Sequence, residues 1–267
     1  MAVKMFVSDM DGTLLNSKRE ISDVNVAKIR QASRDGLIFT VATGRMYRAA
    51  LPYAIKMGIH VPIISHNGAV IKTIWGKRLA ISYIEPELVT QVVDFADELG
   101  FYVHVYTENN FCYRHPSKES DWYEAAVNMK GLEVGDNLRE YNKGIAKILI
   151  MDLSVQHVQE IMDKFHERFG DSLQCQNSDP SHVEIMAPGV SKANAILKLA
   201  EIYHIQPEEI AAIGDSGNDV PMLKQAGTGI VVANANDVAK GAAKYQVASN
   251  DDNGVAEAID RFFYHTK

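Results

Sequence analysis

The chain has 267 residues, of which 46% are hydrophobic and 23% charged, and its formal net charge is −7. This composition is typical of globular proteins and excludes a largely disordered chain, and the scattered acidic residues argue against nucleic acid as a partner. No apolar stretch reaches the roughly 20 residues that cross a bilayer, and no signal segment precedes the first predicted strand, so we expect a soluble, cytoplasmic protein with no membrane partner. Cys112 and Cys175 stand far apart and predict neither a disulfide framework nor a zinc site.

A short apolar run at residues 5–7 predicts a buried strand, which is followed at residues 9–15 by the motif DMDGTLL. In open α/β sheets, chemistry is placed at the carboxyl ends of the strands. Two carboxylates held there, Asp9 and Asp11, favour a hard cation such as Mg²⁺, because like charges in a confined site otherwise raise one pKa. One carboxylate can attack phosphorus while the other transfers a proton. For this motif taken by itself, a solvated turn is the alternative.

The next elements predict a parallel sheet. Ser22 is placed to cap a helix, and residues 37–42 form a second apolar run, so the order strand, helix, strand indicates a right-handed crossover. The second strand leads into Thr43 and Gly44, before a helix predicted over residues 45–57. A hydroxyl and backbone amides at a helix N-terminus can seat a phosphate oxygen, although simple helix capping by Thr43 explains the same pattern. A hairpin predicted over residues 62–71 places Asn67 at the edge of the cleft.

From about residue 84 the pattern changes to amphipathic helices and strands that alternate in polarity, such as residues 101–106, which predict a strand exposed on one face. We therefore predict an inserted α+β domain over residues 84–186 and a main domain formed by residues 1–83 and 187–267. The elements predicted in the inserted domain are helices at 86–100, 121–130 and 154–169, and strands at 101–106, 146–151 and 182–186.

The main domain resumes near Ser191, which is placed to cap a helix that has Lys192 in its first turn. A cation there opposes the helix dipole, so its placement suggests a function, although a lysine bent into solvent is the alternative. Residues 210–213 predict another buried strand, and the acidic loop GDSGND follows it at residues 214–219. The remaining predicted elements are strands at 229–232 and at Val247 and a closing helix at 254–264.

These pieces, in this order, resemble the haloacid dehalogenase superfamily and, within it, the Cof-type phosphatases with an α/β cap of class II (subclass IIB). The matching motifs are DMDGTLL at 9–15, TGR at 43–45, Lys192, GDSGND at 214–219, NG at 67–68 and DNGVA at 252–256. The resemblance spans nearly the whole chain, and it implies a Rossmann-like parallel sheet core flanked by helices, with an inserted α+β cap domain. Ala193 stands where relatives often have glycine, which is harmless in a first helical turn.

The resemblance further implies a Mg²⁺-dependent phosphatase that hydrolyses small phosphorylated metabolites, such as sugar phosphates or phosphorylated cofactors, through an aspartyl-phosphate. Asp9 would be the nucleophile and Asp11 the general acid/base. The metal would be held by Asp9, Asp215 and the main-chain carbonyl of Asp11 or a side chain nearby. The phosphoryl oxygens would be bound by the Met10 amide, Thr43, Gly44, Lys192 and Asn218, and Asp219 would orient Lys192 or a metal-bound water.

The cap would close over the substrate, exclude water and shape the leaving-group pocket. We assign no cap residue to the substrate, because Arg114, His115 and Glu184 are equally well explained as ordinary loop or strand positions. A phosphomutase of the same superfamily, a metal-dependent glycosyltransferase and a non-catalytic binding protein are the alternative functions. The glycosyltransferase leaves Lys192 and the loop of Asp215 unexplained. We expect a monomer or a small homo-oligomer.

Overall fold

The computed structural model describes residues 2–177 and 179–265. Its core is a five-stranded sheet in the order β14-β13-β12-β1-β2, and every neighbouring pair is parallel. The parallel sheet predicted from the sequence, including a strand at Val247, is confirmed. The strands are β1 (Met5–Ser8), β2 (Ile38–Val41), β12 (Ile210–Gly214), β13 (Thr228–Val232) and β14 (Tyr245–Val247).

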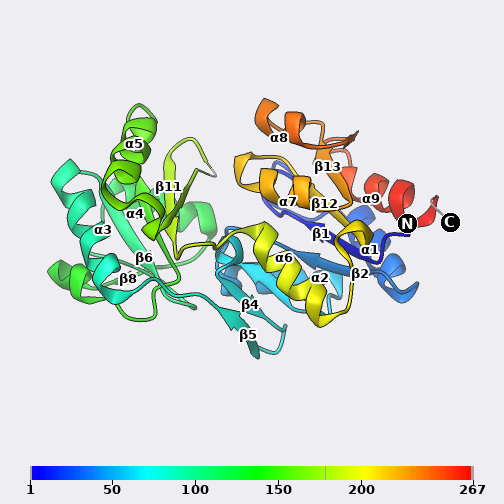
Figure 1. Ribbon diagram of the computed structural model, residues 1–267, viewed down its shortest axis with the longest axis horizontal. Helices are drawn as coiled ribbons and strands as arrows, with labels where there is room; N and C mark the ends of the chain where they lie inside the picture. Colours follow the sequence, from blue (N-terminus) through cyan, green and yellow to red (C-terminus); the bar gives the residue numbers. More distant parts are fainter. Residues whose placement is uncertain (1, 178, 266–267) are drawn as a thin grey trace.

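Helices cover both faces of this sheet. Because successive side chains of a strand point to opposite faces, neighbouring residues of one strand pack against helices on different sides. Phe6 of β1 packs in one apolar cluster with Ile29 of a helix on its side, whereas Val7 packs in another with Leu199. The first cluster includes residues of α1 (Asp23–Arg34), α2 (Tyr47–Met57) and α9 (Gly254–Ile259), and the second includes residues of α6 (Lys192–Ile202) and α7 (Val220–Gln225). Figure 1 shows this layered core with both chain termini on it. α8 (Asp237–Ala242), which was not predicted, and a π-helical turn (Asp260–Tyr264) complete it.

The starts of three core helices can be compared with those predicted from the sequence. Ser22 caps α1 and Ser191 caps α6, as predicted, each with its side chain accepting a backbone N–H. The helix predicted from residue 45 begins two residues later at Tyr47, because Met46 is extended (φ −61°, ψ 152°). Residues 43–45 are therefore a loop at the end of β2.

A small antiparallel sheet follows, in the order β3-β4-β5, formed by β3 (Ile63–Ser65), β4 (Val70–Lys72) and β5 (Arg78–Ile81). The predicted hairpin is confirmed, although β5 was not predicted. Its first turn is a 3₁₀ turn in which His66 and Asn67 both have positive φ angles, of 51° and 54°. Such angles are uncommon for residues other than glycine, so surrounding contacts must hold this turn.

The second large sheet has the order β10-β11-β9-β6-β7-β8 and is antiparallel except for β7 and β8. Its strands all lie within the predicted cap segment 84–186, which Figure 1 shows beside the core. The exact domain boundaries stay predictions, and residues 1, 178, 266 and 267 lie outside the described residues. The elements are α3 (Pro86–Leu99), β6 (Tyr102–Tyr106), β7 (Phe111–Tyr113), α4 (Lys118–Val127), β8 (Leu132–Glu133), β9 (Lys147–Met151), α5 (Val158–Phe169), β10 (Gln174–Gln176) and β11 (His182–Met186).

The prediction that β6 is exposed on one face is wrong. One face of the cap sheet, including Val105, packs against α3 and α5, and the other, including Tyr106, packs with Met46 and Ala49 of the core. The cap sheet is thus covered on both sides. Among the described residues, no helix combines the length and apolar character needed to cross a membrane.

The predicted helix boundaries in the cap also need correction. α4 begins three residues before the predicted start because Ser117 forms a capping box with Ser120. α5 begins four residues late, since the Asp152 carboxylate accepts hydrogen bonds from the backbone amides of Ser154 and His157 and holds that segment as a turn. The short strands β7, β8 and β10 were not predicted.

Candidate active site

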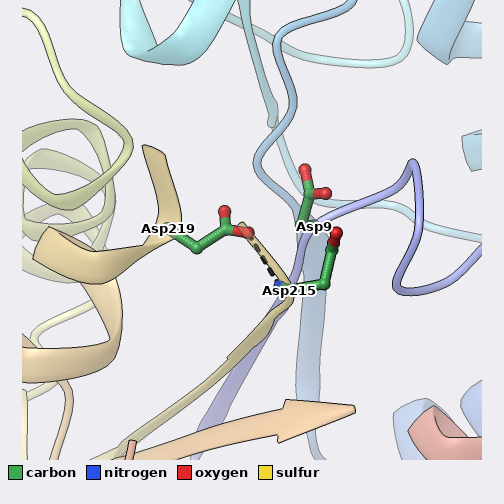
Figure 2. Close-up of side chains that lie close together, drawn as sticks. All are labelled: Asp9, Asp215 and Asp219. Carbon is green, nitrogen blue, oxygen red and sulfur yellow. Dashed lines mark hydrogen bonds between the residues drawn. The ribbon is translucent and has the colours of Figure 1, made fainter. Parts of the chain in front are cut away.

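The ends of β1 and β12 bring Asp9 and Asp215 together. Carboxylate oxygens of Asp9, Asp215 and Asp219 all lie within 4.8 Å of one another, and Figure 2 shows the three side chains converging from two loops. Asp9 and Asp215 follow neighbouring parallel strands, and Asp219 lies four residues further on, just before α7. The acidic loops separated by about 200 residues in the sequence therefore form one site, as expected for the carboxyl edge of an α/β sheet.

Lys192 joins this cluster from the first turn of α6. Its Nζ donates to Oδ1 of Asp9 at 2.6 Å and to Oδ1 of Asp219 at 2.7 Å. The residue is only 2% exposed, which excludes the alternative of a lysine bent into solvent. Burial lowers the pKa of Lys192, but the charges of Asp219 and Asp9 raise it by more than burial lowers it. The lysine therefore stays charged.

One lysine cannot balance three carboxylates, of which Asp9 and Asp219 are buried and Asp215 is partly buried. Burial raises the pKa of Asp9 well above its usual range, and Asp219 and Asp215 add to this despite the opposing effect of Lys192. Burial, and then the charge of Asp219, raise the pKa of Asp215 to about 6. Closely spaced carboxylates with unbalanced charge suit a hard, oxygen-preferring divalent cation, so the residues present fit Mg²⁺.

The backbone at this site leaves room for the carboxylates. Gly12 has φ +75°, and a Cβ atom there would come within 2.6 Å of Asp215 Oδ2. Thr13 donates its hydroxyl to Asp215 Oδ1 at 2.5 Å. Asp215 is therefore fixed in place by the DMDGTLL loop, in which a side chain at position 12 would collide with it.

Asp219 holds Lys192 and the loop of Asp215 in position through hydrogen bonds. It is 0% exposed, its Oδ2 accepts from the backbone amides of Asp215 and Ser216 at 2.9 and 3.1 Å, and its Oδ1 accepts from Lys192. Its oxygens are thus engaged, and it does not line the cleft. Of the three carboxylates, Asp9 and Asp215 are the ones placed to hold a cation.

Asp11 lines the cleft, but its side chain lies apart from the cluster of carboxylates, and its role as general acid/base stays a prediction. Among the described residues, the carboxylates that cluster do not include that of Asp11, which is 52% exposed. Its two oxygens instead accept from Nε and Nη2 of Arg45 at 2.6 and 2.5 Å. Arg45 in turn lies over the ring of Tyr53, 5.2 Å from its centroid. The main-chain carbonyl of Asp11 stays a predicted metal ligand.

The predicted phosphate-binding residues meet the acidic cluster at a cleft of about 210 Å³. Thr43 accepts a hydrogen bond at Oγ1 from the Arg45 amide at 3.1 Å, which folds the loop into a tight turn. Asn218 donates to Oδ1 of Asn67 at 3.3 Å, and the Met10 side chain is buried in the core, leaving only its backbone for any role. The predicted site residues that line the cleft are Asp9, Asp11, Thr43, Gly44, Asp215 and Asn218; Lys192 and Asp219 lie behind Asp9.

The cap closes the other side of this cleft. Lys147 and Glu184 form a buried ion pair of 2.6 Å there, and Trp122, Tyr123 and His182 complete an aromatic wall. None of these residues was assigned to the site from the sequence, although Glu184 was considered. A signal was present, because Lys147 opens the apolar strand KILIM and Glu184 interrupts the apolar strand HVEIM, and charges at such positions need a buried partner.

The two other cap residues considered earlier lie elsewhere. Arg114 forms an ion pair with Asp97, and His115 contacts Glu133 and Asp136, which raise its pKa. Both pairs are on the outside of the cap and do not line the cleft. Leaving these two out of the site is consistent with the structure, whereas Glu184 belongs to the lining.

Comparison with known proteins identifies the family. The family model described as haloacid dehalogenase-like hydrolase matches residues 6–259. The 5-amino-6-(5-phospho-D-ribitylamino)uracil phosphatase YwtE of Bacillus subtilis is 28% identical, with 97% of this chain and 98% of that protein covered. A haloacid dehalogenase-like hydrolase from Bacteroides thetaiotaomicron is 29% identical, with a TM-score of 0.87 and 98% and 100% of the two chains covered.

A third protein, the subclass IIB sugar phosphatase BT4131, shares the fold with a TM-score of 0.86 at 23% identity, covering 97% of this chain and 99% of its own. The predicted enzyme class and the predicted arrangement of core and cap are therefore confirmed. The chain belongs to the haloacid dehalogenase-like hydrolases, as a Cof-type member whose α/β cap has the fold of that subclass IIB sugar phosphatase, and this is a family of enzymes that act on phosphoric monoesters.

Proposed function

We propose that this protein is a Mg²⁺-dependent phosphatase that hydrolyses small phosphorylated metabolites in the cytoplasm through an aspartyl-phosphate on Asp9. The observation that carries the proposal is the buried contact between Asp9 and Lys192, 2.6 Å long, beside Asp215 at the cleft. A carboxylate in that position is fixed, partly desolvated and next to a cation. These are the conditions under which it can act as a nucleophile towards phosphorus.

In the first step, a carboxylate oxygen of Asp9 attacks the phosphorus atom of the substrate. The bond between phosphorus and the leaving-group oxygen breaks, and Asp11 gives that oxygen a proton, so an alcohol departs. Asp11 begins this step from its contact with Arg45 and must turn towards the leaving group. Gly12, which follows it with a positive φ, gives the loop the backbone freedom to present this side chain.

In the second step, Asp11 removes a proton from a water molecule, whose oxygen attacks phosphorus. The bond between phosphorus and the Asp9 oxygen breaks, which restores the Asp9 carboxylate and releases inorganic phosphate. The general acid of the first step is thus the general base of the second. Atoms and charge balance without a further reactant.

The remaining residues stabilise charge. In phosphoryl transfer, negative charge spreads over the equatorial oxygens, so positioning and electrostatics are the main task of the protein. We assign these oxygens to Thr43 with the Gly44 amide, Asn218 and the Met10 amide, and to Lys192, whose Nζ lies 2.6 Å from Oδ1 of Asp9. Asp219 holds Lys192 in position through the 2.7 Å contact.

Asp9 and Asp215 would hold the Mg²⁺ ion, with the Asp11 carbonyl as the predicted third protein ligand. When bound, the ion supplies positive charge that neutralises the carboxylates and draws electron density from the phosphoryl group. The raised pKa values of Asp9 and Asp215 support this assignment, because they mark a site that needs such a charge.

For the substrate, we propose a phosphorylated sugar or cofactor whose leaving group fits between the core and the aromatic wall of Trp122, Tyr123 and His182. This agrees with the names of the relatives, which include phosphatases of 5-amino-6-(5-phospho-D-ribitylamino)uracil and a sugar phosphatase. The small cleft and the net charge of −7 favour a small metabolite over a nucleic acid.

The test is a screen of phosphorylated metabolites for phosphate release with Mg²⁺, beside Asp9→Asn and the surface control Asp163→Asn. We expect the control to match the wild type and Asp9→Asn to lose activity by about 10⁴-fold or more, because no other group can form the covalent intermediate. Equal activity of wild type and Asp9→Asn would contradict the nucleophile. Transfer of the phosphoryl group to a second hydroxyl without free phosphate would instead favour the phosphomutase.

A further inference from the structure

Each of the three carbonyl oxygens in the loop at residues 43–45 accepts a hydrogen bond. The carbonyls of the first and last residues accept from the backbone amides of Asn67 and His66, both at 2.9 Å. The middle carbonyl, that of Gly44, accepts from Nζ of Lys147 at 3.0 Å. The first two donors belong to the neighbouring turn of the core, whereas the third comes from strand β9 of the cap.

Lys147 is held firmly where it makes this contact. It is 1% exposed, its Nζ lies 2.6 Å from Oε1 of Glu184, and it stands 4.5 Å from the centroid of the Tyr106 ring. A buried ammonium group is costly unless it is paired and hydrogen-bonded, and here it has a carboxylate, a carbonyl and an aromatic face. The lysine therefore has little freedom to move away from Gly44 while the cap is docked.

Glu184, the ion-pair partner of Lys147, is hydrogen-bonded to a side chain of the core. Oε2 of Glu184 accepts from Nδ2 of Asn67 at 2.8 Å, and Oδ1 of Asn67 accepts from Nδ2 of Asn218 at 3.3 Å. A Cβ atom on Gly44 would meet Oδ1 of Asn67 at 3.0 Å, so this amide is packed against the loop itself. The strained turn of Asn67 is thus fixed partly by a side chain of the cap.

We propose that Lys147 and Glu184 are positioning residues that set the conformation of the phosphate-binding loop when the cap is docked. The peptide between Gly44 and Arg45 is held at both ends, since its oxygen accepts from Lys147 and its N–H donates to Oγ1 of Thr43. Cap docking completes the seat for the phosphoryl group, so enclosure of the substrate and binding of its phosphate are coupled. The inference rests on the proposed phosphatase function.

A role in stability alone does not explain why the ion pair lies at this place. Buried ion pairs often contribute little net stability, because desolvation offsets the attraction between the charges. The chain has a second ion pair between the hairpin and the cap, Lys72 with Glu108, whose side chains are each 6% exposed and 2.5 Å apart. That pair lies outside the lining of the cleft. It serves as a control because it has similar burial and charge and makes no contact with residues 43–45, although its ammonium group lies 5.0 Å from the centroid of the Tyr47 ring at the start of α2.

The experiment compares Lys147→Met with Lys72→Met in the full chain. Three quantities are measured: amide hydrogen exchange of a peptide covering residues 43–47 in the ligand-free protein, the affinity for inorganic phosphate with Mg²⁺ by calorimetry, and kcat/KM for a simple aryl phosphate. In Lys147→Met we expect faster exchange, and phosphate affinity and kcat/KM lowered about tenfold or more, as for the loss of a hydrogen bond to a charged group. In Lys72→Met we expect all three to stay near the wild-type values.

Equal effects of the two substitutions on the loop would overturn the proposal, as would unchanged exchange in Lys147→Met. Weaker phosphate binding with unchanged exchange would mean that Lys147 contacts the phosphoryl group directly, which also contradicts a positioning role. If Lys147→Met does not fold, Glu184→Gln keeps the shape and removes the opposing charge, and it should accelerate exchange at residues 43–47. A wild type that releases no phosphate from any substrate would refute the proposed function, while the exchange experiment would still decide the coupling.

Discussion

The two walls of the cleft carry their charges in opposite ways. The core wall clusters three carboxylates, two of them buried, beside one ammonium group, that of Lys192, which contacts Asp9 and Asp219, and burial raises the pKa of Asp9 and Asp215. The cap wall pairs one ammonium group, that of Lys147, with one carboxylate, Glu184. An unbalanced cluster stores electrostatic repulsion that a cation and a phosphoryl group can relieve, whereas a balanced pair is complete without a ligand. The core wall is therefore suited to chemistry and the cap wall to docking.

The largest difference between the walls should appear when each lysine is removed. Lys192→Met leaves Asp9 and Asp219 without their cation, so we expect kcat to fall about 10²- to 10³-fold, as for the loss of a charge-stabilising donor. Breaking such a buried pair should also cost about 3–5 kcal/mol in the free energy of unfolding. Steady-state kinetics and urea unfolding measure the two effects. A kcat within threefold of the wild type would contradict the assignment of the core wall to chemistry.

Removal of a carboxylate should change the free energy of unfolding in opposite directions for the two walls: an increase for the core wall and a decrease for the cap wall. Because the pKa of Asp215 in the folded protein, about 6, exceeds its ordinary value of 3.8, its charged form destabilises the metal-free protein at neutral pH. Asp215→Asn should raise the free energy of unfolding by about 3 kcal/mol without metal, at about 1.4 kcal/mol for each pKa unit, and abolish the stabilisation by Mg²⁺.

The matched substitution on the cap wall is Glu184→Gln, which leaves the Lys147 ammonium without its opposing charge and should lower stability. Thermal unfolding of both variants, with Mg²⁺ and with a chelator, makes the comparison. Destabilisation of the metal-free protein by Asp215→Asn would show that the core carboxylates do not repel one another enough to destabilise the folded state.

The pH dependence should come from the core wall. As the pH falls through about 6, protonation of Asp215 competes with the cation, so the affinity for Mg²⁺ should fall about tenfold for each further pH unit. Over the same range the contribution of Asp215 to the stability of the metal-free protein, taken as the difference between the wild type and Asp215→Asn, should become more favourable, since a raised carboxyl pKa favours the folded state at low pH.

The Asp152 carboxylate of the cap should respond only at much lower pH. Hydrogen bonds from Ser154 and His157 lower the pKa of Asp152 to about 2 against the effect of burial, so its contribution to stability is present above its ordinary pKa of 3.8 and is lost as the pH falls towards 2. Denaturation curves from pH 2 to 8 and Mg²⁺ titrations by calorimetry from pH 5 to 8 test both statements. An affinity for Mg²⁺ that stays constant over this range would contradict the core assignment.

The core wall was more predictable from the sequence than the cap wall, for a physical reason. Asp9 and Asp215 follow apolar strands directly, and parallel strands of one sheet place their carboxyl ends at a common edge, so local patterns were enough to bring them together. Lys192 was indicated by its unfavourable place at a helix start. The contact of Asp11 with Arg45 was not foreseen, because the direction of a side chain depends on its neighbours in space.

The cap wall depends on pairings that local sequence does not specify. Lys147 and Glu184 lie on neighbouring antiparallel strands, β9 and β11. Whether their side chains share a face depends on the register of these strands, which the local sequence does not specify. The alternation of residues 101–106 indicated a strand, but whether its second face is covered depends on how the cap docks on Met46 and Ala49. Short strands such as β8 and β10 are stabilised mainly by their neighbours in the sheet, so local patterns indicate them weakly.

The smallest expected effect concerns the aromatic wall. Trp122 lines the cleft and is half-exposed, and its ring stands 5.7 Å from that of His182. Trp122→Ala should raise KM by about two- to tenfold for substrates with a bulky leaving group, since one aromatic contact contributes about 0.5–1.5 kcal/mol. The affinity for inorganic phosphate should not change, because phosphate lacks the leaving group. Steady-state kinetics with two substrates of different size and calorimetry with phosphate make the measurement. Weakened phosphate binding in Trp122→Ala would show that the cap wall cannot be divided into a part that sets the phosphate loop and a part that contacts the leaving group.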